Sequence, residues 1–209
     1  MTNADLRERF IDLALANPAN AAILERLPAL GAPDAWLVAG CLYQAVWNDK
    51  AGRAPDENVK DYDIFYCDRS DLGWDAEDAV IKRADSLFAD LGIEHEVRNQ
   101  ARVHLWYEKK FGEPGTVLTS SRDGIERFLV ACTCVGLRTG PEGLELCAPH
   151  GLQELFDGRL APNPLQPSGN FRAKALSYQA RWPWLKIVDE VANDVPTAPV
   201  GMESLPGGR

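Results

Sequence analysis

The sequence predicts strands that alternate with helices around a mixed sheet, packed as an α/β or an α+β fold. The 209 residues suit one domain, and an apolar content of 45% is enough for a sizeable core. Segments with helical spacing of apolar residues alternate with short runs of branched and aromatic residues. No apolar run has the roughly 18 residues of a membrane span, so no membrane association is expected.

The first elements expected are helices within residues 1–30. Leu6, Phe10 and Leu13 follow helical spacing, and residues 19–27 repeat the pattern after a proline. We expect these two segments to form a helical hairpin that covers the sheet.

A strand and a glycine turn come next. Residues 35–39 are a short apolar run, which predicts a buried strand, and they lead through Gly40 and Cys41 into helical spacing over residues 42–47. A strand, a glycine and a helix start place backbone N–H groups where a phosphate can approach closely. This turn is a candidate phosphate site, and Gln44 is placed to line it.

Asp61 and Asp63 are the most informative residues of the chain. The branched and aromatic residues 64–66 predict a strand, and alternate side chains of a strand share one face. Two carboxylates at the end of a buried strand repel each other and are costly to desolvate. A hard cation relieves that cost, and Mg²⁺ is the usual one where phosphate is also present. The alternative is a strand edge with two solvated aspartates.

The rest of the chain predicts further alternation. A helix is expected over residues 75–91, with Asp75, Glu77 and Asp78 in its first turn as surface charges that suit the helix dipole. The later elements are strands over 93–97 and 102–107, a helix over 121–131, a hairpin of 135–138 with 144–147, a short helix ending near 156, and a helical segment within 162–192 that is split before Pro183. Prolines and glycines predict a disordered tail over 193–209.

The order of strand, glycine turn, helix and Asp-x-Asp strand resembles the polymerase-β-like nucleotidyltransferase superfamily. Its usual pattern is a hydrophobic residue, Gly, and Gly or Ser, followed by two acids one residue apart on the next strand. Cys41 departs from this pattern, because it stands where Gly or Ser is expected. The block 96–107, with motifs at 44–48 and 60–63, looks like a bacterial family of single-domain nucleotidyltransferase-like proteins with no settled substrate, over residues 10–191.

The resemblance implies an α+β fold, in which helices flank a twisted mixed sheet and further helices are added at the N- and C-termini. Residues 1–192 would form this fold as one domain. The resemblance also implies transfer of a nucleoside monophosphate from an NTP to an unknown acceptor, with Mg²⁺ or Mn²⁺ as cofactor. Asp61 and Asp63 would bridge the metal ions, and an acid on the following strand would complete the site. Glu94 and Glu96 share a face there, and Glu96 is preferred because it lies in the matching block.

Asn99, Gln100, Arg102 and His104 form an unusual polar cluster between apolar residues. On the expected strand, Arg102 and His104 share a face. Arginine can clamp a phosphate with two hydrogen bonds, and an imidazole can contact phosphate or transfer a proton. Arg102 is therefore a candidate for stabilising phosphate charge, with Asn99 and His104 beside it. The alternative is a structural hydrogen-bond network in which Arg102 pairs with an acid.

The net charge limits the possible binding partners, and the cysteine content indicates the cellular compartment. A net charge of −9 argues against sequence-independent nucleic-acid binding, but a small nucleotide held through Mg²⁺ is compatible with it. Five cysteines and a charged N-terminus predict reduced thiols in a cytoplasmic protein.

Two other functions are alternatives to nucleotidyl transfer. One is a non-catalytic nucleotide- or metal-binding module, suggested by Cys41, and the other is a metal-dependent phosphohydrolase.

Overall fold

The structure is a computed structural model that describes residues 2–112 and 114–188. The tail expected over 193–209, and the last residues of the expected C-terminal segment, lie outside these ranges. Within them, no helix is long and apolar enough to cross a membrane.

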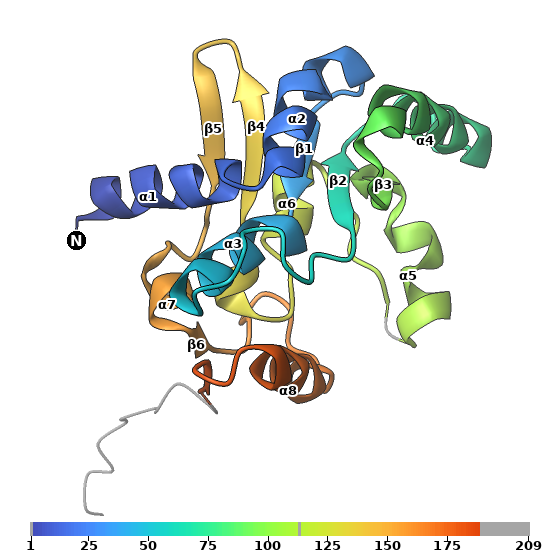
Figure 1. The fold of residues 1–209 in the computed structure, drawn as a ribbon. Coiled ribbons are helices and arrows are strands. Elements are labelled where there is room, and N and C mark those ends of the chain that lie inside the picture. The colour runs from blue at the N-terminus through green and yellow to red at the C-terminus, as the bar shows by residue number, and fades with distance from the viewer. Residues whose placement is uncertain (1, 113, 189–209) are drawn as a thin grey trace, which may run out of the picture.

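A mixed five-stranded sheet lies at the centre, with helices on both faces (Figure 1). Its strands are β1 (Trp36–Val38), β2 (Tyr62–Tyr66), β3 (His95–Asn99), β4 (Gly136–Gly140) and β5 (Gly143–Cys147), in the spatial order β3-β2-β1-β4-β5. β2 and β3 run parallel, whereas the other neighbours are antiparallel. A separate short parallel pair is formed by β6 (Arg159–Leu160) and β7 (Lys186–Ile187). The predicted α+β fold is confirmed.

Helices frame the sheet. They are α1 (Asn3–Leu15), α2 (Pro18–Arg26), α3 (Gly40–Lys50), α4 (Trp74–Phe88), α5 (His104–Phe111), α6 (Ser121–Ile125), α7 (Gln153–Asp157) and α8 (Phe171–Arg181). The N-terminal pair forms as predicted, because Asn17 caps α2 by accepting the Ala19 N–H at 3.0 Å.

The two faces of the sheet carry different side chains. Leu37, Ile64 and Val97 are paired across β1, β2 and β3, and their face packs into the main core. The opposite face carries Trp36 and Val38, which pack against α6 in a smaller apolar cluster. Because side chains alternate along a strand, the acids of β2 and β3 belong to this second face.

One expected strand is a helix instead. Residues 102–107 lie in a 3₁₀ turn and then in α5. The side chain of Asn99 accepts the Ala101 N–H at 3.1 Å, and Arg102 pairs with Glu77 of α4, so the chain bends away from the sheet at this point. Glu77 is correspondingly buried, at 2% exposure, and is not the surface charge expected from the sequence. The helix expected over 121–131 ends at Ile125.

The C-terminal segment is joined to α3 through aromatic side chains. The rings of Trp47 and Trp182 lie 5.2 Å apart, and the Trp182 indole donates to Asn48 Oδ1 at 2.8 Å. The Tyr43 hydroxyl donates to that of Tyr178 at 2.8 Å. These contacts hold α8 below α3 in the view of Figure 1.

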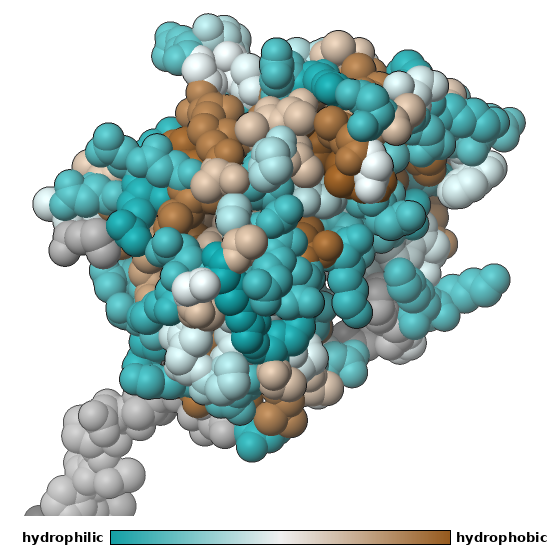
Figure 2. Space-filling model, in the orientation of Figure 1, coloured by the Kyte–Doolittle hydropathy of each residue, from teal (hydrophilic) through white to brown (hydrophobic). Residues whose placement is uncertain are grey.

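In Figure 2, the upper part of the same face carries most of the hydrophobic surface, and the lower part is mainly hydrophilic.

Candidate active site

The acids of β2 and β3 meet at one edge of the sheet. Asp63 lies opposite Glu96 in the parallel pair, so both side chains leave the same face of neighbouring strands. Asp61 directly precedes β2 with the same parity as Asp63. All three line a cavity of about 1070 Å³. Glu94 is exposed and does not line this cavity, which distinguishes it from Glu96.

The surroundings of Asp63 disfavour its charged form. Burial, together with repulsion from Asp61 and Glu96, raises the pKa of Asp63 to about 7. Lys174 and Arg98 lower this pKa, but their effects are smaller than the raising effects. A cation next to Asp63 would replace repulsion with attraction and would bring the pKa back towards its usual range.

Mg²⁺ at this site would need oxygen ligands from the protein. In residues 2–112 and 114–188, no group of three or more His, Cys, Asp or Glu side chains has the arrangement of a metal site. Mg²⁺ in phosphate-transferring enzymes is typically held by one or two carboxylates, with substrate phosphates and water as the other ligands. Asp61 and Asp63 supply two carboxylates of this kind, so the residues present fit the ion together with a triphosphate.

The turn before α3 borders the same cavity. Ala39 has φ +61° and ψ −128°, a conformation that non-glycine residues rarely adopt, and Gly40 follows it and lines the cavity. No side chain caps the start of α3, and the Leu42 N–H already donates to the Ala39 carbonyl at 3.1 Å. The N–H groups of Gly40 and Cys41 are therefore the candidates for contact with a phosphate. Cys41 is fully buried, and its thiol donates to the Val38 carbonyl at 3.5 Å. Its departure from the family pattern therefore lies beneath the cavity.

Gln44 carries an unsatisfied polar atom at this turn. Its side chain lines the cavity and is buried, and among the described residues nothing hydrogen-bonds its Oε1 atom. A Cβ atom on Gly40 would lie 2.8 Å from Gln44 Nε2, so the glycine leaves space for this amide. A buried polar atom without a partner costs about 1–3 kcal/mol. A polar ligand in the cavity would offset that cost.

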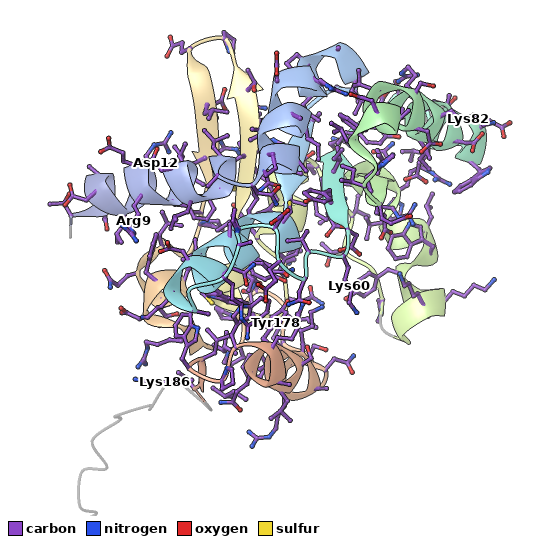
Figure 3. All side chains as sticks on the ribbon, in the orientation of Figure 1. Arg9, Asp12, Lys60, Lys82, Tyr178 and Lys186 are labelled. Atoms are coloured by element: carbon purple, nitrogen blue, oxygen red, sulfur yellow. The ribbon has the colours of Figure 1, made fainter. Side chains whose placement is uncertain are left out.

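Basic side chains of α8, which the sequence analysis does not assign to the site, line the same cavity. Lys174, Tyr178 and Arg181 of α8 line the cavity together with Lys60, and Figure 3 labels Lys60 and Tyr178. The Lys174 ammonium and the Arg181 guanidinium lie 5.3 Å and 5.4 Å from the centre of the Tyr178 ring. Their spacing of four and three residues is the sequence signal that could have placed them on one helix face.

Most of the expected polar cluster lies elsewhere. Arg102 pairs with the buried Glu77, and its Nε donates to the Leu72 carbonyl at 2.9 Å. Asn99 exchanges hydrogen bonds with the backbone of Asp68 at 3.0 Å and 2.8 Å. These two residues, together with His104, do not line the cavity. The structure therefore places Arg102 and Asn99 in a hydrogen-bond network of the kind that the structural alternative describes, outside the cavity.

Comparison with known proteins agrees with this arrangement. Residues 25–187 match the model of a family described as nucleotidyltransferase. No curated protein matches the sequence. An NMR structure described as revealing a CCA-adding enzyme head domain is 24% identical, with a TM-score of 0.70 over 88% of this chain and 96% of that one. The structural match supports the fold, and the family match spans more than half of the sequence, including the acids, the glycine turn and α8. The chain belongs to this nucleotidyltransferase family.

Proposed function

We propose that this protein is a Mg²⁺-dependent enzyme that transfers a nucleoside monophosphate from an NTP to an acceptor. The pairing of Asp63 with Glu96 is the observation that carries the proposal. This pairing places two acids beside the Gly40 turn in one cavity, which the basic side chains of α8 also line. The cavity has a volume of about 1070 Å³, near the upper limit of the roughly 300–1,000 Å³ typical of ligand sites, and therefore has room for a nucleotide.

Each part of the cavity has a role in this proposal. Lys60, Lys174 and Arg181 bind triphosphate oxygens, and the first N–H groups of α3 approach a phosphate. These local cations allow a chain with a net charge of −9 to bind an anion. Asp61 and Asp63 would hold the metal ion, and Glu96 would complete its site. The ion, when bound, neutralises charge that develops on the phosphates.

A lone pair of the acceptor hydroxyl or amine attacks the α-phosphorus and forms the new bond. The bond from that phosphorus to the oxygen that bridges to the β-phosphate breaks, and pyrophosphate leaves. The acceptor loses a proton, which passes to Glu96 and then to water.

Replacement of Glu96 in β3 and of Glu94 just before that strand tests the proposal, because the two side chains are chemically the same and only Glu96 lines the cavity. Glu96→Gln should lower pyrophosphate release by about 100-fold or more, while NTP and Mn²⁺ still bind, because both aspartates remain. Glu94→Gln is the matched control and should leave both quantities unchanged. Pyrophosphate release and isothermal titration would measure them.

The result also separates the alternatives. Tight NTP binding with no pyrophosphate release from the unaltered protein would favour the non-catalytic module. Release of orthophosphate or pyrophosphate without any nucleotidylated product would favour a phosphohydrolase. Equal loss of release in the Glu94 and Glu96 variants would contradict the role given to Glu96.

A further inference from the structure

A second, smaller cavity adjoins the nucleotide cavity. Its volume is about 280 Å³. Ring-bearing and aliphatic side chains form most of its wall, namely Phe65, Val103, Trp106, Tyr107, Leu118 and Phe128. Its size is near the lower limit of the roughly 300–1,000 Å³ of ligand sites, so it suits one small ring system.

The two cavities meet at the acids. Asp63 and Glu96 line both of them, as do Tyr107, Arg127 and Phe128. A molecule in the small cavity would therefore present one edge to the carboxylates, and a nucleotide in the large cavity would reach the same place from the other side. This is the relation that an acceptor must have to a donor nucleotide.

The wall of the small cavity offers flat apolar surfaces. The Phe65 and Phe128 rings pack edge to face with centres 5.8 Å apart, and the Trp106 and Tyr107 rings are 6.4 Å apart. Aromatic rings prefer such offset and edge-to-face arrangements with a further ring. The surface therefore favours an occupant that carries a flat ring over a flexible chain.

One polar group of this wall, the Gln100 amide, is fixed in its position. Gln100 is buried and donates to the Arg98 carbonyl at 3.4 Å. A Cβ atom on Gly124 would lie 2.1 Å from Gln100 Oε1, so this glycine is required for the observed position of the amide. Few polar groups that are held in place give a small-molecule pocket its specificity.

Arg127 lies at the junction of the cavities. Its Nη1 donates to the Leu165 carbonyl at 3.2 Å, whereas its buried Nε has no hydrogen-bond partner among the described residues. The pKa of Asp123 is lowered chiefly by a hydrogen bond from Thr119, and the Arg127 charge adds a smaller lowering effect. A cation with an unused donor at this junction suits the phosphate that is transferred between the two occupants.

We infer that the acceptor is a small molecule whose flat ring occupies the second cavity and whose hydroxyl or amine points to Asp63 and Glu96. This inference rests on the proposed function, since only a transfer reaction requires an acceptor. The cavity is too small to enclose a folded protein or a structured RNA. The bond changes are those of the proposed transfer, with the new bond formed to the oxygen or nitrogen on the ring-bearing molecule.

Tyramine and hexylamine are suitable probes, because both carry one ammonium group and only tyramine has a ring. Saturation-transfer NMR without NTP should show binding of tyramine at millimolar concentration and at least fivefold weaker binding of hexylamine. Val103→Trp, which fills the cavity, should reduce tyramine binding at least fivefold and leave NTP binding with Mn²⁺ within threefold. Lys174→Gln, in the other cavity, should show the reverse pattern.

A second variant tests the inference even if Val103→Trp fails to fold. Trp106 is half-buried on α5, so Trp106→Ala should fold, and it should also weaken tyramine binding. Tyramine binding that is equal in all variants, equal binding of hexylamine, or nucleotidylation of a short RNA in place of ring-bearing amines and alcohols would overturn the inference. Failure of the unaltered protein to bind NTP would instead overturn the proposed function, because tyramine binding is measured without it.

Discussion

At the scale of single residues, Asp63 couples the site to the stability of the fold. Its pKa in the folded protein is raised to about 7 from an ordinary value of 3.8, chiefly by burial. A raised pKa means that folding favours the protonated acid, so this contribution to stability is complete below pH 3.8 and is lost as the pH rises through 7. At neutral and higher pH, the ionised form of Asp63 therefore lowers the free energy of unfolding of the ligand-free protein.

The raised pKa of Asp63 predicts how the stability gained by Asp63→Asn depends on pH. In the presence of chelator, Asp63→Asn should raise the free energy of unfolding at pH 8 by roughly 2 kcal/mol, because it removes a desolvated and repelled charge. The gain should decline between pH 7 and pH 4, and Mn²⁺ affinity should largely disappear. Urea unfolding at several pH values and isothermal titration would measure both effects. A gain that is independent of pH would contradict the assigned pKa, and Glu94→Gln serves as the control.

Arg102 gives the opposite case, a charged residue that stabilises the fold and lies outside the site. Arg102→Ala should lower the free energy of unfolding by about 3–5 kcal/mol, because it leaves Glu77 buried without its partner. The double variant Arg102→Met with Glu77→Leu should recover most of this loss. Urea unfolding measures the loss, and nucleotide titration below the melting transition should give unchanged affinity. Weak nucleotide binding with normal stability would return Arg102 to the site.

The difference between these residues shows what the sequence can predict at this scale. Asp61 and Asp63 have a two-residue spacing that fixes a shared face on any strand, so their proximity could be predicted. Glu77 and Arg102 carry no such signal. An acid in the first turn of a helix is usually solvated, and only the packing of α4 on β3 brings Glu77 to Arg102.

At the scale of elements, strands and their faces were predicted well where residues alternate. β2 forms over Tyr62–Tyr66, and the expected hairpin forms as β4 and β5. Residues 102–107 contain Val, Leu, Trp and Tyr, which favour a strand, yet they belong to a turn and to α5. The bend at Asn99 and the ion pair of Arg102 override this local preference, because strand propensity depends strongly on context.

Helix α8 leads to a prediction about nucleotide affinity. Lys174→Gln should weaken NTP binding about tenfold, because it removes a charge that faces the triphosphate, and the effect should shrink at high salt. Its free energy of unfolding should change by less than about 0.5 kcal/mol, since the side chain is exposed. Arg172→Gln removes the same charge from the same helix outside the cavity and should leave affinity unchanged. Equal weakening in both variants would indicate a general charge effect.

At the scale of the whole molecule, the fold and the family follow from the order of elements around the Asp-x-Asp strand. The basic wall of the cavity does not follow from it. The average charge of the chain is strongly negative, and two of the cations, Lys174 and Arg181, come from a helix far beyond the acids in sequence. Only the tertiary contacts between α3 and α8 bring that helix to the site.

These contacts can be tested through Trp182, which is fully buried between the two helices. Trp182→Ala should lower the free energy of unfolding by about 3–5 kcal/mol and should also weaken NTP binding, because α8 carries cations of the cavity. Trp36→Ala, at a residue that is also fully buried but does not line the cavity, should cost a similar amount and leave affinity unchanged. Titration at low temperature, where both variants are folded, would compare them. Normal affinity in the Trp182 variant would show that α8 holds its place without this ring.

The register between β2 and β3 has a consequence for the time course of folding. Asp63 faces Glu96 only in the native pairing, and a slip of one residue would send the glutamate to the opposite face. Parallel strands joined through a helix also pair across a long stretch of chain, and such contacts form slowly. A refolding chain should therefore regain its helical circular dichroism before it regains pyrophosphate release, which requires Glu96 at the site. The recovery of pyrophosphate release would then report the rate of the last step of sheet assembly.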